Sequence, residues 1–355
     1  MLVAFRKVLF LSLIVGIFLS ISASAQLNRK NVKKNNKRMS HFKGRKSNFG
    51  KEKAYTALGF SLSALNYYGD LSPRPGLLST DISFTRPALG VSLLHRFGPR
   101  YTVTGNFMYG TLSGSDATSA DAQDISNGVY RYKRNLSFRN RIKELSVVAS
   151  LDLFENQATY ISRVPWTPYA WAGVALFHHN PKALVPGADL NGQPLAEAGE
   201  WVSLQPLGTE GQYAELLPTD VNYGIEPYKL IQVAIPFGLG ARFRLNEVMD
   251  ISAEIGWRYL FTDYLDDVSQ NYVDLGTLDS ELARAMSYRS NETAFVSDAQ
   301  PVVARNGNTY DLLPGYGQEF ADNLRGSSKD RDIYMVTTFR LTYILGKTFH
   351  KAKFR

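Results

Sequence analysis

Hydrophobic and polar residues alternate along the second half of the chain. In residues 229–245 every second position is apolar, namely Ile231, Val233, Ile235, Phe237, Leu239, Ala241 and Phe243. After the break 246–249, the alternation resumes over 250–264 with Ile251, Ala253, Ile255, Trp257, Tyr259 and Phe261. A period of two predicts strands with one apolar face, and the short break predicts an antiparallel hairpin. Both runs exceed the roughly 9–11 residues that a tilted strand needs to cross a bilayer, so the pattern favours a transmembrane β-barrel.

Six further runs show the same alternation. Together the predicted strands are 54–68, 84–97, 100–113, 141–154, 168–178, 229–245, 250–264 and 332–346. An even number of strands is what a closed bacterial barrel needs. We therefore predict an all-β fold, an eight-stranded antiparallel transmembrane outer-membrane β-barrel over 54–346, in preference to two ordinary domains.

Side-chain parity assigns the two faces of the strand 229–245. Leu239 falls on the lipid face and Gly240 on the lumen face. We expect Leu239→Arg to destabilise the barrel by about 2–4 kcal/mol, and Gly240→Ser to cost less.

Connection lengths predict the orientation of the barrel. The connections 98–99, 155–167 and 246–249 are short, and they alternate with the longer 69–83, 114–139, 179–227 and 265–330. In outer-membrane barrels short turns face the periplasm and long loops face outside. The sequence therefore predicts extracellular loops, with both termini in the periplasm.

The N-terminus has the pattern of a secretory signal peptide over 1–25. Arg6 and Lys7 precede an apolar stretch, and Ala23-Ser24-Ala25 supplies small residues for cleavage. Gln26 follows, where a lipoprotein would have Cys, and the chain has no cysteine at all. No later stretch approaches the roughly 18 apolar residues of a membrane helix.

Basic residues are concentrated in two segments at the ends of the predicted barrel. Residues 26–53 contain eleven Lys or Arg against Glu52 alone, whereas the loops 179–227 and 265–330 are acidic. Few apolar residues predict a disordered segment, either a solvated leader or a docking arm for an acidic periplasmic partner. With the basic tail 347–355, the candidate docking residues are Arg29, Lys30, Lys33, Lys34, Lys37, Arg38, Lys347, Lys351, Lys353 and Arg355.

Charged residues also fall on the inward faces of the predicted strands. They are Arg86, Arg96, Glu144, Asp152, Arg242, Arg244, Glu254, Arg258 and Arg340. Eight strands enclose a space that side chains can fill, and unpaired charge inside would be costly. We therefore predict a lumen closed by ion pairs rather than a pore.

Catalytic and cofactor motifs are missing from the sequence. It has no nucleophile elbow, HExxH motif, P-loop or dinucleotide fingerprint. His178 and His179, near the predicted outer end of a strand, are the candidates for rim hydrolase or acyl-transfer chemistry. We predict no enzymatic activity, cofactor or metal, and a signal peptide argues against nucleic acid as a partner.

The long loop 265–330 is predicted to contain some internal order. Residues 277–289 have Leu278, Leu282, Ala285 and Met286 at helical spacing after an acidic start. A short helix with one apolar stripe must pack on something. With the aromatic stretch 310–320 it is expected to cap the barrel mouth, and a protein contact is the alternative.

Several segments resemble one family of outer-membrane barrels. The segments are Ala64–Leu71 (ALNYYGDL), Phe84–Gly90 (FTRPALG), His95–Phe97 with Pro99-Arg100, Tyr109-Gly110, Ser113–Asp116 (SGSD), Thr262–Val268 (TDYLDDV) and Arg325–Asp332 (RGSSKDRD). In combination they are similar to the PorG-type barrels of the Bacteroidetes, over roughly 54–346. The resemblance implies a non-enzymatic outer-membrane subunit of the type IX protein secretion apparatus.

The same resemblance implies the partners. They are outer-membrane lipid and the periplasmic ring lipoprotein with its partner subunits, reached through the turn 155–167 and the two tails. Two alternatives are a surface-interaction or adhesion barrel acting through its acidic loops, and a lipid-modifying enzyme at the barrel rim.

Overall fold

The computed structural model describes residues 53–72, 85–125, 128–156, 162–329 and 331–345. The chain divides into a unit of residues 1–50 and a unit of residues 51–355. The predicted signal peptide and almost all of the segment 26–53 lie outside the described residues, as does the tail 347–355. No helix within the described ranges is long and apolar enough to cross a membrane.

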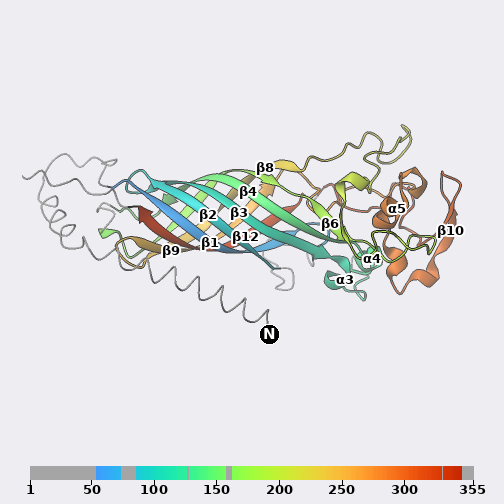
Figure 1. Cartoon of the computed structure of the whole chain (residues 1–355), viewed down its shortest axis with the longest axis horizontal. Helices are drawn as coiled ribbons and strands as arrows, with labels where there is room; N and C mark the ends of the chain where they lie inside the picture. The colour runs from blue at the N-terminus through green and yellow to red at the C-terminus, as the bar shows by residue number, and fades with distance from the viewer. Residues whose placement is uncertain (1–52, 73–84, 126–127, 157–161, 330, 346–355) are drawn as a thin grey trace, which may run out of the picture. The chain divides into compact units, whose positions relative to one another are not determined.

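Eight long strands form one closed antiparallel sheet (Figure 1). They are β1 (Tyr55–Tyr68), β2 (Arg86–Arg96), β3 (Tyr101–Ser115), β4 (Ser137–Asp152), β5 (Trp166–His178), β8 (Ile231–Arg244), β9 (Met249–Leu260) and β12 (Ile333–Leu345). Each pairs with the next, and β12 pairs with β1 along its whole length, which closes the barrel. The predicted eight-stranded barrel is confirmed. β3 and β4 extend further toward the long loops than predicted, because they stay paired as far as Ser115 and Ser137.

The apolar face of each strand points away from the barrel interior, as side-chain parity predicts. Leu239 is 64% exposed, and Ile235 and Phe243 on the same strand are exposed as well. Aromatic side chains flank this apolar belt; Trp166 stacks on Phe243 at the end with the short turns. An outward apolar belt with aromatic borders is the surface that a transmembrane barrel presents to lipid.

Inside the barrel, aromatic rings lie over glycines of the neighbouring strands. A Cβ at Gly238 would lie 2.7 Å from Cζ2 of Trp171, and a Cβ at Gly240 would lie 2.7 Å from Cζ of Tyr169. Tyr169 and Gly240 are direct partners in the pairing of β5 with β8. The lumen position at Gly240 is already filled by the Tyr169 ring, so Gly240→Ser must crowd this ring. That it costs less than Leu239→Arg stays a prediction.

The short turns gather at one end of the barrel, the turn end. Arg163, between β4 and β5, donates from Nη1 to the Glu247 carbonyl and from Nη2 to Asp250, at 2.8 and 2.6 Å. These bonds tie the described part of the turn 155–167 to the β8–β9 turn. Residues 157–161 of the predicted contact turn lie outside the described residues.

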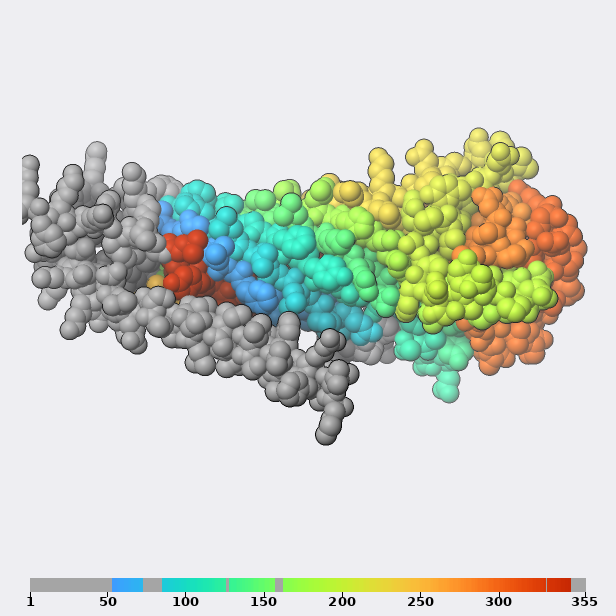
Figure 2. All heavy atoms as spheres, viewed as in Figure 1, coloured from blue at the N-terminus to red at the C-terminus, as the bar shows by residue number. Residues whose placement is uncertain are grey.

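The long loops fold together beyond the opposite end, the loop end (Figures 1 and 2). We call the described parts of 116–136, 179–230 and 261–332 the loop cap. Its elements are α3 (Asp116–Ser119), α4 (Gly128–Arg134), β6 (Pro181–Leu184), β7 (Trp201–Ser203), η3 (Gln205–Leu207), η4 (Leu275–Thr277), α5 (Glu281–Ser287), η5 (Ser290–Glu292), η6 (Val296–Asp298), β10 (Gln300–Val303) and β11 (Thr309–Leu312).

The predicted loop helix exists but is shorter than 277–289. It is α5, which begins after the cap Ser280, whose side chain accepts a hydrogen bond from the Ala283 N–H. Met286 of its apolar stripe is 2% exposed and packs with Ala183, Val185 and Leu204. A second cluster of the cap contains Tyr272, Leu275, Leu278, Tyr288, Tyr310 and Tyr316. The loop cap thus has its own hydrophobic core.

Candidate functional site

Two bidentate ion pairs lie in the middle of the barrel interior, one across it and one between adjacent strands. Arg258 of β9 donates to both carboxylate oxygens of Glu144 on β4, at 3.1 and 3.2 Å. The Tyr334 hydroxyl donates to the same carboxylate at 2.7 Å. Arg340 binds both oxygens of Glu254 at 2.8 and 3.0 Å. Such fork-to-fork pairs neutralise charges that would be costly in an enclosed space.

A third cluster lies near the turn end. Asp152 accepts a hydrogen bond from Arg96 at 2.6 Å and one from Arg242 at 3.1 Å. Arg96 also donates to the Gly98 carbonyl at 2.8 Å, so it fixes the β2–β3 turn as well. Seven of the nine inward charges predicted from the sequence therefore meet in these pairs.

Arg86 and Arg244 are placed differently from the other seven. Arg86 is half-buried at the loop end of β2, where it donates to the Thr85 carbonyl. Arg244 is exposed at the turn end of β8 and forms no ion pair within the described part of the chain. Arg244 therefore does not join the predicted lumen pairs, because its side chain is exposed at the turn end, where it lines a small cavity together with Arg242 and Asp250.

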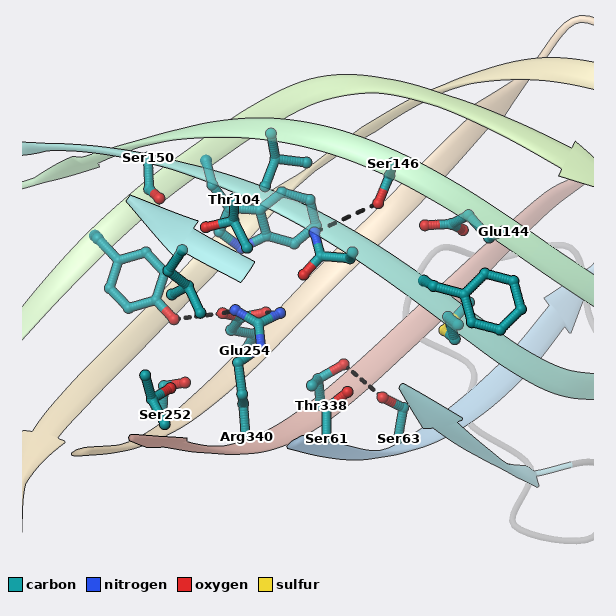
Figure 3. Close-up of a pocket in the computed structure, with 18 of the residues that line it drawn as sticks. Ser61, Ser63, Thr104, Glu144, Ser146, Ser150, Ser252, Glu254, Thr338 and Arg340 are labelled. Carbon is teal, nitrogen blue, oxygen red and sulfur yellow. Dashed lines mark hydrogen bonds and ion pairs between the residues drawn. The ribbon is translucent and has the colours of Figure 1, made fainter. Parts of the chain in front are cut away.

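Side chains fill most of the barrel interior. A cavity of about 40 Å³ remains, lined by hydroxyl-bearing side chains and by the Glu144 and Glu254 carboxylates (Figure 3). Ser63 and Thr338 hydrogen-bond to each other across its wall at 2.8 Å. A polar space of this size holds about three or four water molecules. This part of the barrel is a packed, hydrogen-bonded plug.

A second polar network closes the loop end of the barrel. The Tyr67 hydroxyl of β1 lies 2.5 Å from Oδ2 of Asp266 and 2.9 Å from Oδ1 of Asp332. The other oxygen of each carboxyl accepts a backbone N–H, from Val268 and Leu265. A phenol has one hydrogen, so it can donate to only one of the two carboxyls. The second contact needs a carboxyl proton, and burial raises the pKa of both Asp266 and Asp332 well above the usual range.

Asp263 and Asp70 belong to the same group. Burial and repulsion by Asp70 raise the pKa of Asp263 to about 8. Its Oδ1 accepts the Asp332 N–H at 3.2 Å, and Asp70 accepts the Ser327 N–H at 2.9 Å. These acidic side chains are thus held in place largely by backbone donors of the loop cap.

Buried arginines connect this acidic group to the cap. Arg325 donates to Glu210 at 3.0 Å and lies 3.5 Å from an oxygen of Asp267. Asp267 also accepts hydrogen bonds from Thr209 and Tyr228, each at 2.6 Å. Burial raises the pKa of Glu210, although Arg325 acts in the opposite direction.

Arg134 joins three segments at one point. It donates to both oxygens of Asp116 at 2.8 and 2.9 Å, to the Arg325 carbonyl at 2.6 Å and to the Asp70 carbonyl at 2.8 Å. We call this whole assembly the mouth network; its members are Tyr67, Asp70, Asp116, Arg134, Glu210, Asp263, Asp266, Asp267, Arg325 and Asp332.

The mouth network brings together segments that are remote in the sequence. Tyr67 is 199 residues from Asp266 and 265 from Asp332. Four of the segments that carry the family resemblance, 64–71, 113–116, 262–268 and 325–332, each contribute a member. Arg134 and Glu210 were not expected from the sequence. In the sequence, Arg134 and Glu210 are visible only as charged residues within loops, and most charged residues on a protein surface have the same pattern.

The two histidines named as catalytic candidates differ in their burial and surroundings. His179 is buried and stacks on Tyr228, and its Nε2 lies 3.1 Å from the Lys229 carbonyl. Burial lowers its pKa to about 4. His178 is half-buried on the outward face of β5. Neither has a described Ser, Asp or Glu side chain as a hydrogen-bond partner, and the described residues contain no group arranged to hold a metal ion.

Comparisons with known proteins find one family model and several solved outer-membrane proteins. The family model, described as a domain of unknown function, DUF6089, matches residues 47–193. Ail, the attachment invasion locus protein of Yersinia pestis, is similar at 7% identity and a TM-score of 0.32, over 82% of this chain and 99% of that chain. Neisserial surface protein A has 7% identity and a TM-score of 0.34, over 82% and 99%.

A major outer membrane protein from Thermus thermophilus is similar at 10% identity and a TM-score of 0.34, again over 82% of this chain and 99% of that chain. No curated protein sequence matches this chain. At such low identities these likenesses concern the fold alone.

Proposed function

We propose that this chain is a non-enzymatic outer-membrane scaffold subunit of the type IX protein secretion apparatus, which anchors periplasmic ring subunits to the membrane. One observation carries the proposal most directly. Four of the segments that resemble the PorG-type barrels meet at the mouth network, where Tyr67, Asp266 and Asp332 share hydrogen bonds. This part of the resemblance therefore falls on residues with one common structural role.

The filled interior supports a scaffold rather than a channel or an enzyme. The ion pairs of Glu144 and Glu254 occupy the middle of the barrel, and the remaining cavity is about 40 Å³. A cavity of that size admits no substrate. What the barrel offers to other molecules is its outer surface and its two ends.

The turn end is the proposed docking surface for the ring subunits. Arg163 ties the described part of the turn 155–167 to the β8–β9 turn, so these joined residues form part of the proposed surface. Residues 26–52 and 347–355 of the two basic segments lie outside the described residues, and each segment adjoins a barrel strand on this side in the sequence. In this proposal they give electrostatic attraction to an acidic partner, and the loop cap faces the exterior.

Purification from detergent-solubilised outer membranes tests the proposal. The full chain should recover ring lipoprotein and partner subunits, and cells that lack it should fail to secrete type IX cargo. An intact cargo profile in its absence would contradict the secretion role.

A surface-interaction barrel is the second candidate, and the loop cap gives the specific reason. Tyr223 is 58% exposed and Phe320 is 60% exposed. Asn271 hydrogen-bonds to the Phe320 carbonyl and Asn222 hydrogen-bonds to the Asn271 carbonyl, so the two segments are neighbours. Exposed aromatic residues can mark a contact site. Removing both side chains should abolish host or surface binding in this alternative and leave ring-subunit recovery unchanged in the scaffold proposal.

A further inference from the structure

The outward face of β4 changes from apolar to basic along its length. Leu145 and Val147 are exposed apolar residues of the lipid-facing belt. The next three outward positions toward the loop end are Lys143, Arg141 and Arg139. Alternate residues of a strand lie about 6.6 Å apart, so the three cations cover about 13 Å directly beyond the apolar belt.

Neighbouring strands add to this basic surface. Arg139 is the direct partner of Lys182 on β6, and Lys143 pairs with His178 on one side and Tyr109 on the other. Lys182 is also the single Lys or Arg of the acidic loop 179–227. We call Arg139, Arg141, Lys143 and Lys182 the outer basic patch.

The patch has no anionic partner in the described part of the chain. Arg141 and Lys143 are exposed, Arg139 and Lys182 are half-buried, and none of the four forms an ion pair with a described residue. The interior cations on the same barrel are paired with carboxylates. Like charges on adjacent strands repel, so an unpaired group of this kind is suited to an external anion.

Trp201 orients one of the cations. The Arg139 guanidinium lies 3.9 Å from the centre of the Trp201 ring. A guanidinium that lies over an aromatic ring keeps N–H groups available at its edge, and two such groups match two phosphate oxygens. Trp201 itself is 37% exposed, so the pair lies at the surface.

The position of the patch selects a lipid over a soluble anion. The patch continues the same strand face that contacts hydrocarbon, and it begins one outward position after Leu145. That is the depth at which lipid headgroups meet a transmembrane barrel, and tyrosine and tryptophan are enriched there. Tyr109 and Trp201 flank the patch accordingly.

We propose that the outer basic patch binds the phosphate of a phosphorylated lipid headgroup in the leaflet at the loop end of the barrel. Arg139 supplies the oriented guanidinium edge, and Arg141, Lys143 and Lys182 supply the surrounding positive charge. This inference depends on the barrel spanning a membrane and does not depend on the proposed secretion role.

Native mass spectrometry of the full chain in detergent micelles tests it, with bisphosphorylated lipid A and its enzymatically dephosphorylated form as probes. The test variant is Arg141→Gln/Lys143→Gln, because both side chains are exposed and the barrel should fold. The control is Arg100→Gln/Arg244→Gln, which removes two positive charges at the turn end. Heat-modifiable migration on a gel checks the fold of each.

Wild type and control should prefer the phosphorylated lipid, and the test variant should bind it about 30-fold more weakly. The dephosphorylated lipid should bind all three proteins alike. Equal affinity of wild type and test variant for the phosphorylated lipid would overturn the proposal. Equal binding of both lipids by wild type would also overturn it. A polyglutamate peptide serves as a soluble polyanion, and tighter binding of this peptide than of the phosphorylated lipid by wild type would overturn it as well.

Discussion

Arg258 and Glu144 form a bidentate ion pair across the barrel interior, with donor–acceptor distances of 3.1 and 3.2 Å. Glu144 is 1% exposed, and Tyr334 donates to it as well. Removal of one partner from such a pair leaves a buried charge without compensation.

We therefore expect Arg258→Met to lower the free energy of unfolding by about 3–5 kcal/mol, measured by urea titration in lipid vesicles. Arg244→Gln removes the same charge at an exposed position and should cost less than about 0.5 kcal/mol. Equal losses of unfolding free energy in the two variants would show that the interior ion pair does not stabilise the barrel.

Gly240 and Gly105 allow a comparison of the two faces of the barrel, because Gly240 lies on the inward face and Gly105 lies on the outward face beside Leu93 and Val147. A methyl at Gly240 meets the Tyr169 ring, whose hydroxyl bonds to Glu254 at 2.5 Å, whereas a methyl at Gly105 meets nothing within 4 Å. We expect Gly240→Ala to destabilise by about 1–3 kcal/mol, and Gly105→Ala to be near neutral. Leu239→Arg, on the lipid face, should cost about 2–4 kcal/mol. Urea midpoints of the three variants would show the order, and a neutral Gly240→Ala would contradict the packing described for Tyr169.

The period of two made the barrel predictable, because lipid outside and a polar plug inside impose opposite demands on successive residues. It assigned Leu239 and Gly240 to the correct faces. It could not show that Tyr169 fills the space over Gly240, because that contact comes from the neighbouring strand.

The loop end was predictable only in part. The helix α5 has a periodic apolar stripe and was expected, whereas β6, β7, β10 and β11 have three or four residues each, too few for a period to be recognised. The mouth network depends on contacts such as Tyr67 with Asp332, 265 residues apart. Such partners follow from the closed barrel and from loop packing, which no local pattern encodes.

The mouth network should make the loop cap sensitive to pH. Asp263 has a pKa of about 8, raised from an ordinary carboxyl value mainly by burial. The folded cap thus binds this proton more tightly than the unfolded chain does. The stabilisation is fully present below about pH 4 and is lost as the pH rises through about 8.

Hydrogen exchange of the cap should therefore speed up between pH 5 and pH 9, after correction for intrinsic exchange rates. Asp263→Asn carries no titrating proton and should make this dependence shallower. Asp279→Asn, at an exposed position of the cap, should leave it unchanged. A dependence that is the same in all three proteins would exclude Asp263 as its source.

The orientation of the barrel can be tested with a single cysteine, since the chain has none of its own. Asn306, exposed in the loop cap, is a suitable position. Asn306→Cys should react with a membrane-impermeant maleimide on intact cells. Labelling only after the outer membrane is permeabilised would place the loop cap in the periplasm.

The central claim is that this barrel anchors periplasmic ring subunits, with the basic segment 26–53 as one contact. This segment contains eleven Lys or Arg residues and a single Glu. Its electrostatic attraction to an acidic ring subunit should weaken as the salt concentration rises. The most direct measurement is quantitative recovery of ring subunits with the full chain and with a chain lacking 27–50, at low and high salt. We expect strong recovery with the full chain at low salt, and reduced recovery on deletion or at high salt. Failure of the full chain to recover any ring subunit at low salt would contradict it.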